Sequence, residues 1–390
     1  MRVLLAPDCF TGTLTAGQAA QALATGWSRH APQDVLELCP LSDGGPGFVD
    51  VLAQVLDGDL LTVTVPGPLG DPTPATVLLV AGPPGAPGPT AYLEAAQASG
   101  LHLVPADRRD PGLTGTAGVG VLLEHARQAG AARIVVGLGG SGTNDGGAGM
   151  LAALAEPGDG DPPSRLRNGG AALAGITAAE LAWLPAVRER WSGLELVAAS
   201  DVDCPLLGFH GASAGFAAQK GATPQRAQEL ERCLGDFAAA AGTALGDGGS
   251  TGAGSTAAVP GAGAAGGLGF GILLLGGHRV PGAQAVLDAV GFPARLAAAD
   301  LVVTGEGCFD WQSLRGKVVA GVAHSALQVG TPVVVVAGQV LVGRREAQSI
   351  GIESAYPVAR TPAEVEASLA DPAGTLAARA ERVARTWSRR

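Results

Sequence analysis

The sequence at 332–337, Pro-Val-Val-Val-Val-Ala, is a continuous apolar run of strand length. A strand that is hydrophobic at every position is typical of the centre of a parallel sheet whose two faces are covered by helices. Residues 300–304, Asp-Leu-Val-Val-Thr, predict a neighbouring strand, and a helical pattern over about 315–328 lies between the two. This succession predicts an α/β fold.

The N-terminus has the same rhythm of strand, polar turn and helix. Residues 2–6 and 35–40 predict strands, which are followed by the acidic residues Asp8 and Asp43. Thr15 can cap an Ala-rich helix after the first strand, and a second helix is expected to reach about residue 56. Both ends of the chain therefore predict parts of one parallel sheet.

The segment between the two ends has a different pattern. We expect a Rossmann-like parallel-sheet α/β domain, 1–60 plus 289–390, that is built from both termini and interrupted by a second, inserted α/β domain at 61–288. Within the insert, residues 61–80 predict a hairpin-like pair of strands. Residues 246–267, composed almost entirely of Gly, Ala, Ser and Thr, predict the most flexible segment.

The composition restricts the class of protein and its partners. Of 390 residues, 47% are hydrophobic and 15% are charged, and the formal net charge is −10. Without a clustered Lys/Arg face, this balance argues against nucleic acid and membrane surfaces as partners. Because no run is suited to span a bilayer or to direct secretion, we expect a cytoplasmic protein with small-molecule partners. The five cysteines include no CxxC pair, and the oligomeric state stays open.

Acidic residues follow several of the expected strands. They are Asp8, Asp43, Asp201 with Asp203, and Glu306 with Asp310. Ligands of open parallel sheets bind outside the carboxyl ends of the strands. Carboxylates gathered there can hold Mg²⁺ and accept a proton from a hydroxyl group. Alternatively, each of them caps the helix that follows it.

A glycine-rich loop follows the strand expected at 133–137. It contains Gly139, Gly140, Ser141, Thr143, Asn144, Asp145, Gly146 and Gly147, and Gly137, Gly139 and Gly142 form a GxGxxG pattern. Backbone N–H groups in such a loop, at the start of a helix, can hold phosphate. The acidic residue of dinucleotide-binding sites is missing downstream, so the hydroxyl, amide and carboxylate groups favour a nucleoside triphosphate. A tight turn without ligand is the alternative.

Lysine is scarce in this chain, which has only Lys220 and Lys317 among its 25 Lys and Arg residues. An ammonium and a guanidinium group are not interchangeable, so a retained lysine can have a chemical reason. Both lysines are expected in Gly-flanked turns, where an ammonium group can reach a phosphate; solvated surface lysines are the alternative.

Several motifs occur in order over about residues 3–340. They are Ala6-Pro7-Asp8, Asp43-Gly44-Gly45, Gly139-Gly140-Ser141, Thr143-Asn144-Asp145-Gly146-Gly147, Asp201-Val202-Asp203, Gln219-Lys220-Gly221-Ala222, the glycine-rich 261–269, and Thr304-Gly305-Glu306-Gly307 with Asp310, Gln312, Gly316 and Lys317. As a set, they resemble the bacterial glycerate kinases of the type-1 family. The resemblance implies a two-domain α/β fold and phosphorylation of D-glycerate by ATP with Mg²⁺, usually at the 2-hydroxyl group.

The matched positions lead to a hypothesis for each site residue. Asp43 or Asp8 accepts the hydroxyl proton, and Lys220 and Lys317 neutralise the transferring oxygens. The loop at 139–147, together with Gly266 and Gly267, binds the nucleotide phosphates. The candidates for substrate or metal binding are Asp145, Asp201, Asp203, Glu306 and Asp310, of which Asp201 and Glu306 are the ones expected to contact Mg²⁺ or its waters.

The sequence departs from the family pattern at five matched positions. Cys9 stands in place of a serine, Thr11 of a lysine, Pro46 of a glutamate, Cys204 of an asparagine and Cys308 of an arginine. Two cations that can hold a phosphate or a carboxylate are therefore missing. Three alternatives stay open: a nucleotide-binding pseudo-kinase of the same fold, a kinase of another small hydroxy acid, and a dinucleotide-dependent dehydrogenase.

Overall fold

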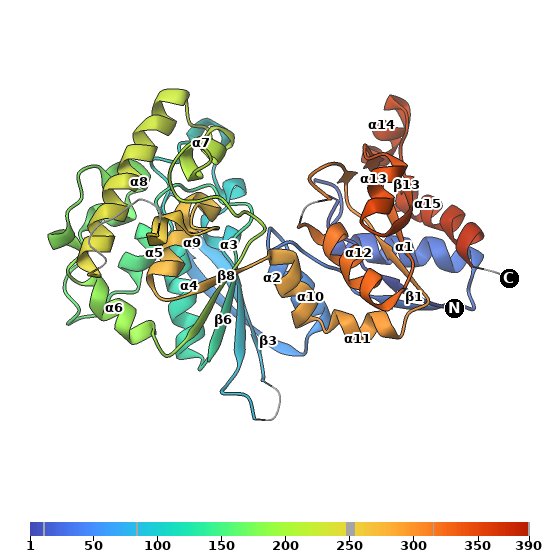
Figure 1. The fold of residues 1–390 in the computed structure, drawn as a ribbon, viewed down its shortest axis with the longest axis horizontal. Coiled ribbons are helices and arrows are strands. Elements are labelled where there is room, and N and C mark those ends of the chain that lie inside the picture. The colour runs from blue at the N-terminus through green and yellow to red at the C-terminus, as the bar shows by residue number, and fades with distance from the viewer. Residues whose placement is uncertain (11, 83–84, 247–253, 315, 389–390) are drawn as a thin grey trace. The chain divides into compact units, whose positions relative to one another are not determined.

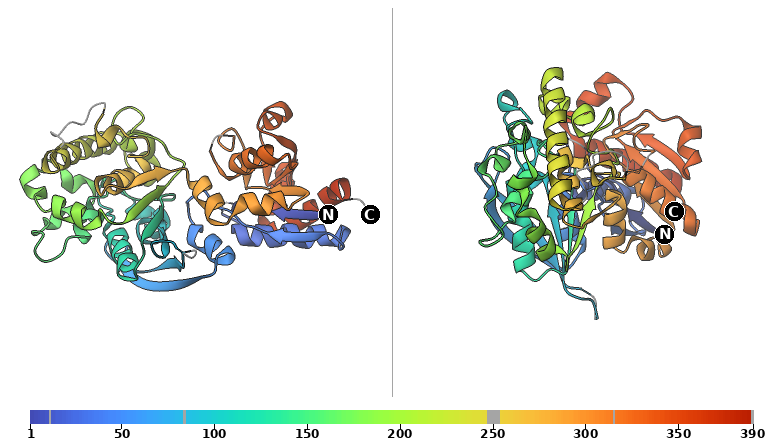
Figure 2. Two further views of the ribbon diagram at one scale, coloured as in Figure 1. Left: turned by 60° about the horizontal axis from the view of Figure 1, so that its bottom comes forward. Right: turned by 60° about the vertical axis from the view of Figure 1, so that its left-hand side comes forward.

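The computed structural model describes the chain except for residues 11, 83–84, 247–253, 315 and 389–390. The described chain forms two compact units (Figures 1 and 2). Unit 1 comprises Met1–Asp43, Asp50–Leu56 and Gly282–Arg390, and unit 2 comprises Gly44–Val49 and Asp57–Pro281. Each unit has its own sheet, so each is described by itself.

Unit 1 contains a parallel sheet with the strand order β13-β11-β9-β1-β2. Its strands are β1 (Arg2–Leu5), β2 (Val35–Leu38), β9 (Leu301–Thr304), β11 (Val333–Ala337) and β13 (Ile352–Pro357). From β1 the chain proceeds to β2 on one side, whereas β9, β11 and β13 extend the sheet on the other side. The order of the strands therefore reverses between β1 and β9, which is where open α/β sheets bind their ligands.

Helices cover the unit 1 sheet on both faces. Leu5, Val303 and Val336 pack in one cluster with Leu23 of α1 (Ala16–His30) and Leu376 of α15 (Pro372–Trp387). On the other face α12 (Val318–Val329) contacts β9 and β11, beside α10 (Gly282–Ala289) and α11 (Phe292–Ala297). The smaller elements are α2 (Phe48–Val55), β10 (Cys308–Phe309), β12 (Gln339–Val340), α13 (Arg344–Ser349) and α14 (Pro362–Ala370). The prediction of an α/β fold from residues 332–337 is confirmed, because every residue of β11 is buried.

Unit 2 contains a mixed sheet whose strands follow one another in chain order. They are β3 (Gly58–Pro66), β4 (Pro72–Val80), β5 (Thr90–Glu94), β6 (Arg133–Gly137), β7 (Glu195–Ala199) and β8 (His278–Val280). The first two pairs are antiparallel, which confirms the hairpin expected at 61–80, and the other three pairs are parallel. Right-handed crossovers that all proceed in one direction place their helices on one face of the sheet.

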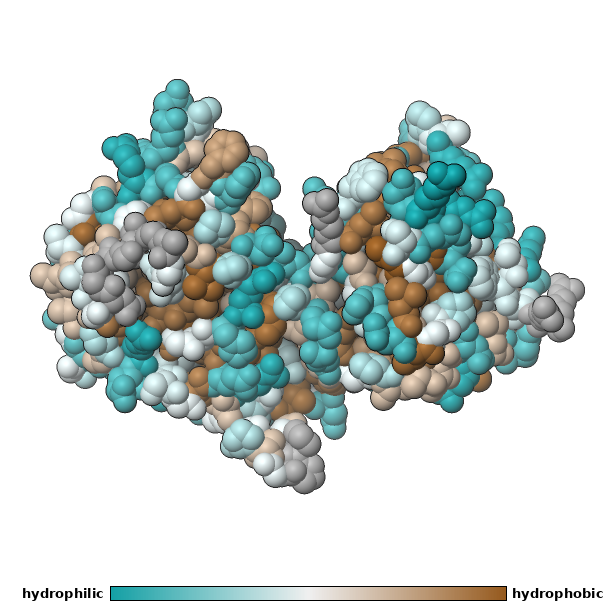
Figure 3. Space-filling view, viewed as in Figure 1, coloured by the Kyte–Doolittle hydropathy of each residue, from teal (hydrophilic) through white to brown (hydrophobic). Residues whose placement is uncertain are grey.

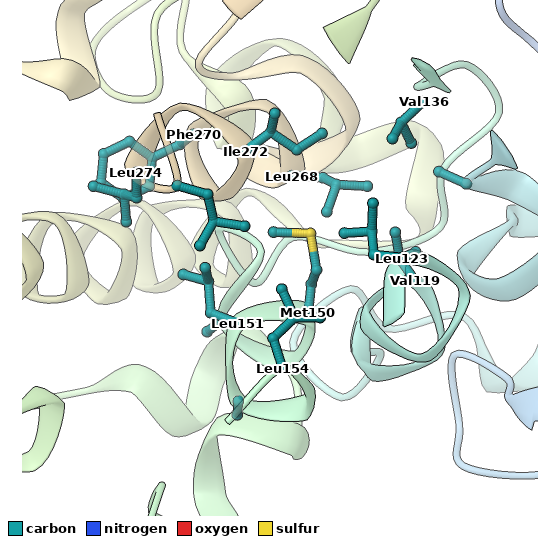
Figure 4. Packing of buried hydrophobic residues seen from close by; sticks show 14 of the residues in the cluster. Val119, Leu123, Val136, Met150, Leu151, Leu154, Leu268, Phe270, Ile272 and Leu274 are labelled. Atoms are coloured by element: carbon teal, nitrogen blue, oxygen red, sulfur yellow. The ribbon is translucent and has the colours of Figure 1, made fainter. Parts of the chain in front are cut away.

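The core of unit 2 lies on that face. The helices are α3 (Ala96–Ser99), α4 (Ala117–Gln128), α5 (Ala148–Ala153), α6 (Leu184–Trp191), α7 (Ala212–Phe216), α8 (Pro224–Ala244) and α9 (Ala264–Leu274). Met150 of α5 extends between Leu123 of α4 and Leu268 of α9 (Figure 4). α8 contacts α6 and α7 and forms an outer layer (Figure 1).

Part of the segment 246–267, for which the sequence predicts flexibility, is packed in the structure. A short 3₁₀ turn covers Thr256–Ala258, α9 begins at Ala264, and Ala257 and Ala262 are buried. The small side chains allow close packing at these described residues. Residues 247–253 of this prediction lie outside the described residues.

Some strands carry too weak a signal to be predicted. β5, Thr-Ala-Tyr-Leu-Glu, and β13, Ile-Glu-Ser-Ala-Tyr-Pro, lack a clear apolar run or alternation.

On the face viewed in Figure 3, hydrophilic and hydrophobic residues are interspersed over both units. Within the described residues, none of the helices combines the length and apolarity that crossing a bilayer requires.

Candidate functional site

Three carboxylates gather at the carboxyl ends of the unit 1 strands. Asp8 follows β1, Asp43 follows β2 and Glu306 follows β9, and the charges of Asp43 and Glu306 both act on Asp8. Glu306 is buried, whereas Asp8 and Asp43 are half-buried. Since the strand order reverses between β1 and β9, this cluster occupies the position expected for a ligand site.

The register of β1 and β9 explains why Asp8 and Glu306 are neighbours. Leu5 pairs with Val303, and the ladder continues beyond the strands, because Ala6 N–H donates to the Val303 carbonyl at 2.8 Å and Asp8 N–H donates to the Gly305 carbonyl at 2.8 Å. With the same offset, Asp8 lies opposite Glu306. Side chains opposite each other in adjacent parallel strands point to the same face of the sheet.

This proximity and burial change the protonation of both groups. Burial, followed by the charge of Asp43 and then that of Glu306, raises the pKa of Asp8 to about 7, although the Cys9 N–H donates to Asp8 Oδ1 at 2.6 Å. Burial likewise raises the pKa of Glu306 to about 7. Carboxyl groups with a pKa near neutrality can take up and release protons at the working pH of an enzyme.

The turn after β10 lies beside Glu306. The Ser313 side chain and the Lys317 ammonium both oppose the increase of the Glu306 pKa. Glu306 Oε1 is buried and has no hydrogen-bond partner within the described residues. Asp310 is engaged in the turn, because its Oδ1 accepts the Gln312 N–H at 2.8 Å. Lys317 is half-buried at the N-cap of α12, so its Gly-flanked position is as expected.

The glycine-rich loop at 139–147 joins β6 to α5 in unit 2. Positive φ angles at Gly140, Gly146 and Gly147 bend it sharply. Most of its N–H groups are bonded within the protein; for example, Gly142 N–H donates to the Ser99 carbonyl at 2.8 Å. Thr143 and Asn144 are fully buried and Ser141 nearly so, whereas Gly139 and Gly140 reach the surface. In this conformation, therefore, the rim at Gly139–Gly140 is the part of the loop that a ligand can approach.

Asp145 holds this loop together. Its Oδ2 accepts hydrogen bonds from Thr116 N at 2.9 Å, Thr116 Oγ1 at 2.8 Å and Gly149 N at 3.2 Å, and its Oδ1 accepts one from Gly147 N at 3.1 Å. The side chain is fully buried, which raises its pKa despite these bonds. A carboxylate with four donors in a solvent-free site fits a structural role better than the predicted metal contact.

Lys220 is also buried, so the alternative of a solvated surface lysine is wrong for this residue. It ends a 3₁₀ turn (Ala218–Lys220), is 3% exposed, and its Nζ donates to the Thr143 carbonyl at 2.7 Å. Burial lowers its pKa to about 8, although the charge of Asp145 opposes the change. Because the ammonium group is directed at the loop backbone, we interpret Lys220 as a residue that positions the loop rather than one that contacts phosphate.

Gly266 and Gly267 serve the packing of the same loop. A Cβ atom on Gly266 would lie 1.9 Å from the Thr143 carbonyl oxygen, and one on Gly267 would lie 2.7 Å from Gly146 Cα. Both glycines are buried and have positive φ angles, and Ala265 beside them adopts φ +52°. Two backbone segments touch here, so both glycines are needed for this packing, and their role in phosphate binding stays a prediction.

The remaining acidic candidates of unit 2 follow β7. Asp201 is half-buried and Asp203 is exposed, so both lie at the carboxyl edge of the sheet, as their positions in the sequence predict. Sequence reasoning missed Glu94, which ends β5 and accepts the Gly47 N–H at 3.0 Å through Oε2. The signal that could have found it is the one used for Asp8, an acidic residue that closes an apolar strand.

The described residues contain no set of three or more His, Cys, Asp or Glu side chains arranged to hold a metal ion by themselves. Mg²⁺ usually takes only one or two protein carboxylates and completes its shell with waters and substrate phosphates. The buried Glu306 Oε1, beside the like charges of Asp8 and Asp43, fits that kind of partial donor set.

Comparison of the whole chain with known proteins identifies its family. The model of the glycerate kinase family matches residues 3–388. The chain belongs to this glycerate kinase family. It is 38% identical to a glycerate kinase of Bacillus subtilis strain 168 and 35% identical to the glycerate 2-kinase of Escherichia coli K12, in each case over 92% of this chain and 90% of the relative. The solved structure of a Salmonella typhimurium LT2 protein provisionally named glycerate kinase 2 is similar with a TM-score of 0.78 at 34% identity, covering 99% of this chain and 98% of that one.

Membership in the glycerate kinase family makes the protein a kinase, and hence a transferase. Its departures from the family pattern are Cys9, Cys204 and Cys308, all half-buried, and Pro46, which is exposed. Burial raises the pKa of the Cys308 thiol and raises that of Cys204 to about 11, so both are neutral near pH 7 and cannot replace a cation. Thr11 lies outside the described residues.

Proposed function

We propose that the protein transfers the γ-phosphoryl group of ATP to the 2-hydroxyl group of D-glycerate, giving 2-phosphoglycerate. The observation that supports this reaction best is the pair Asp8 and Glu306, two adjacent carboxyl groups with pKa values of about 7 at the strand-order reversal of unit 1. The family supports the acceptor, and the name of the E. coli relative, a glycerate 2-kinase, supports the position on it.

Asp8 is the candidate general base. Its carboxyl group stands at the end of β1, half-buried, and a pKa of about 7 lets it accept the hydroxyl proton and return it to solvent. Glu306 and Asp43 contribute by the repulsion that raises this pKa. A general base of this kind contributes roughly 10²–10⁴-fold to a rate.

Charge neutralisation is the second requirement of phosphoryl transfer, which depends mostly on positioning and electrostatics. Lys317 is half-buried at the N-cap of α12 and acts electrostatically on Glu306, so its ammonium group belongs to the carboxylate cluster. Glu306, with its unpartnered Oε1, is the residue that would hold Mg²⁺, together with substrate phosphates. Bound there, Mg²⁺ would offset the negative charge of the phosphates.

Unit 2 is proposed to bind the nucleotide. The rim at Gly139–Gly140 offers accessible glycine backbone after the end of β6, where Gly140 is exposed and the Gly139 N–H donates to the Gly44 carbonyl at 3.0 Å. Asp145 and Lys220 hold the rest of the same loop through Gly147 and Thr143. Asp201 and Asp203, at the end of β7, lie at the same edge of that sheet. We keep Asp201 as a candidate for metal-bound water on this basis.

The test is ADP release from MgATP with D-glycerate, compared with L-glycerate and with no acceptor. Coupling to enolase, which acts on 2-phosphoglycerate and not on 3-phosphoglycerate, assigns the position of transfer. We expect turnover of about 1–100 per second with D-glycerate and a direct enolase signal. Asp8→Asn should lower turnover by about 10²–10⁴-fold while nucleotide still raises the melting temperature.

Two other outcomes would replace the proposal. Stabilisation by ATP without ADP release from any acceptor would indicate a nucleotide-binding relative without turnover, in line with the neutral Cys308 and Pro46. ADP release with another small hydroxy acid, but not with glycerate, would indicate a changed acceptor.

A further inference from the structure

Arg279 has a fixed but incomplete set of contacts at the carboxyl edge of the unit 2 sheet. It lies in β8 opposite Ala198 of β7, and its Nε donates to the Ser200 carbonyl at 3.0 Å. Ser200 N–H in turn donates to the Val280 carbonyl at 3.0 Å, so the carbonyl that receives Arg279 belongs to backbone held by the same two strands. The guanidinium group is therefore positioned directly beside the start of the 200–205 loop.

The stem of Arg279 is positioned as well. A Cβ atom on Gly261 would lie 2.3 Å from Arg279 Cδ, which means that the side chain crosses the backbone at a position where only glycine fits. Gly261 has φ +88°, and its N–H donates to the Cys204 carbonyl at 3.1 Å. Arg279 thus lies between two backbone segments, 200–205 and 259–263, that are bonded to each other.

Arg279 differs from several other arginines of unit 2 in the partners of its charge. The half-buried Arg165, Arg190 and Arg226 of this unit all form ion pairs with carboxylates. Arg279 is half-buried too, yet among the described residues it forms no ion pair, and the structure gives its two terminal amino groups no hydrogen-bond acceptor. No atom of Arg279 is among the buried side-chain atoms that lack a partner in the described residues, so the end of its guanidinium group is open to solvent and to a ligand.

We propose that Arg279 binds an oxyanion group of a substrate through its two terminal amino groups. Because Nε donates to the Ser200 carbonyl, the two terminal amino groups are the donors that can form a bidentate contact with a phosphate or a carboxylate. The inference rests on the proposed function for its choice of ligands, which are the polyphosphate of the nucleotide or the carboxylate of the hydroxy acid. Because the side chain is already ordered, binding costs little conformational entropy.

The experiment compares the wild type with R279Q, R279K and the control R133Q. Arg133 lies at the opposite end of the same sheet, in β6, and pairs with the exposed Glu195. The KM values for MgATP and D-glycerate are measured separately, the affinities for inorganic tripolyphosphate and D-glycerate are measured by calorimetry, and the melting temperature reports folding. We expect R279Q to weaken one ligand about 10–100-fold, R279K to be intermediate, and R133Q to match the wild type.

The pattern of effects identifies the ligand. Weaker MgATP and tripolyphosphate binding assigns the phosphate, whereas a higher glycerate KM with unchanged tripolyphosphate binding assigns the carboxylate. If the wild type has no kinase turnover, the calorimetric comparison still decides. Unchanged constants in R279Q, or a wild type that binds neither probe, would overturn the assignment. If R279Q does not fold, the KM values and calorimetric affinities of R279K decide, and values equal to those of the wild type would overturn the assignment.

Discussion

The ammonium group of Lys220 donates a 2.7 Å hydrogen bond to the carbonyl oxygen of Thr143, and both residues are buried. This bond connects the 3₁₀ turn that ends at Lys220 to the glycine-rich loop of unit 2. The two lysines of the chain therefore stand in different environments, since Lys317 is half-buried at a helix N-cap.

Replacing each lysine by arginine should change the free energy of unfolding by different amounts in the two environments. A guanidinium group is larger and planar, so Lys220→Arg should overpack the buried site and destabilise the protein by about 1–3 kcal/mol. Lys317→Arg should leave stability within about 0.5 kcal/mol, because its side chain has room at the surface. Denaturant unfolding of the two variants measures the difference; equal stabilities would contradict the buried position of Lys220.

Asp8 should make stability depend on pH. Its pKa is about 7 in the folded protein and near 3.8 when the chain is unfolded, so between these values the folded state binds the additional proton. Stability contributed by this proton is present below pH 4 and is lost as the pH rises to 7.

Asp8→Asn does not titrate and should lose less stability over this range. Between pH 4.5 and pH 8, the free energy of unfolding of the wild type should fall by on the order of 2 kcal/mol more than that of the variant. Denaturant unfolding at each pH measures this difference. Two parallel stability profiles would show that the Asp8 pKa is not raised.

Glu306→Gln should change the pH dependence of the remaining activity. Removing this negative charge lowers the pKa of Asp8, so the acid limb of kcat/KM should move to lower pH by about half a unit to one unit. The pH profile is compared between the wild type and the variant with saturating Mg²⁺. An acid limb that stays in place would argue that Asp8 is not the base.

Gly266→Ala tests the contact between the two loops of unit 2. Its Cβ would overlap the Thr143 carbonyl at 1.9 Å, and φ +68° is unfavourable for alanine, so we expect a loss of about 3 kcal/mol or more. Gly235→Ala is the matched control. Gly235 lies in α8 with no atom within 4 Å of the added methyl group, so this change should stabilise the protein by about 0.5–1 kcal/mol.

Local patterns were sufficient to predict much of the fold. The capping box of Thr15 and Gln18, the β3–β4 hairpin and the buried β11 all depend on residues close together in the sequence. The gathering of Asp8 and Glu306 is not local, since 298 positions separate them, but it was expected because acidic residues after parallel strands meet at one edge of the sheet.

The environments of the loop residues could not be predicted in this way. Lys220 and Thr143 are 77 residues apart, and Gly266 meets Thr143 across more than a hundred residues. A Gly-flanked lysine and a glycine-rich stretch have the same sequence whether they meet a ligand or another backbone segment. Arg279 was missed for a similar reason, since its lack of an ion pair among the described residues becomes visible only when the surrounding carboxylates are placed.

The pairing of β1 with β9 bears on how the chain folds during synthesis. Thr304 Oγ1 donates to the Ala6 carbonyl across 298 residues of sequence, whereas the strands of unit 2 pair in chain order. On the ribosome, unit 2 can therefore assemble before β9, the second neighbour of β1 in its sheet, has been synthesised. We expect the carboxylate cluster to form only after β9 has emerged, which makes unit 1 the last part of the protein to mature.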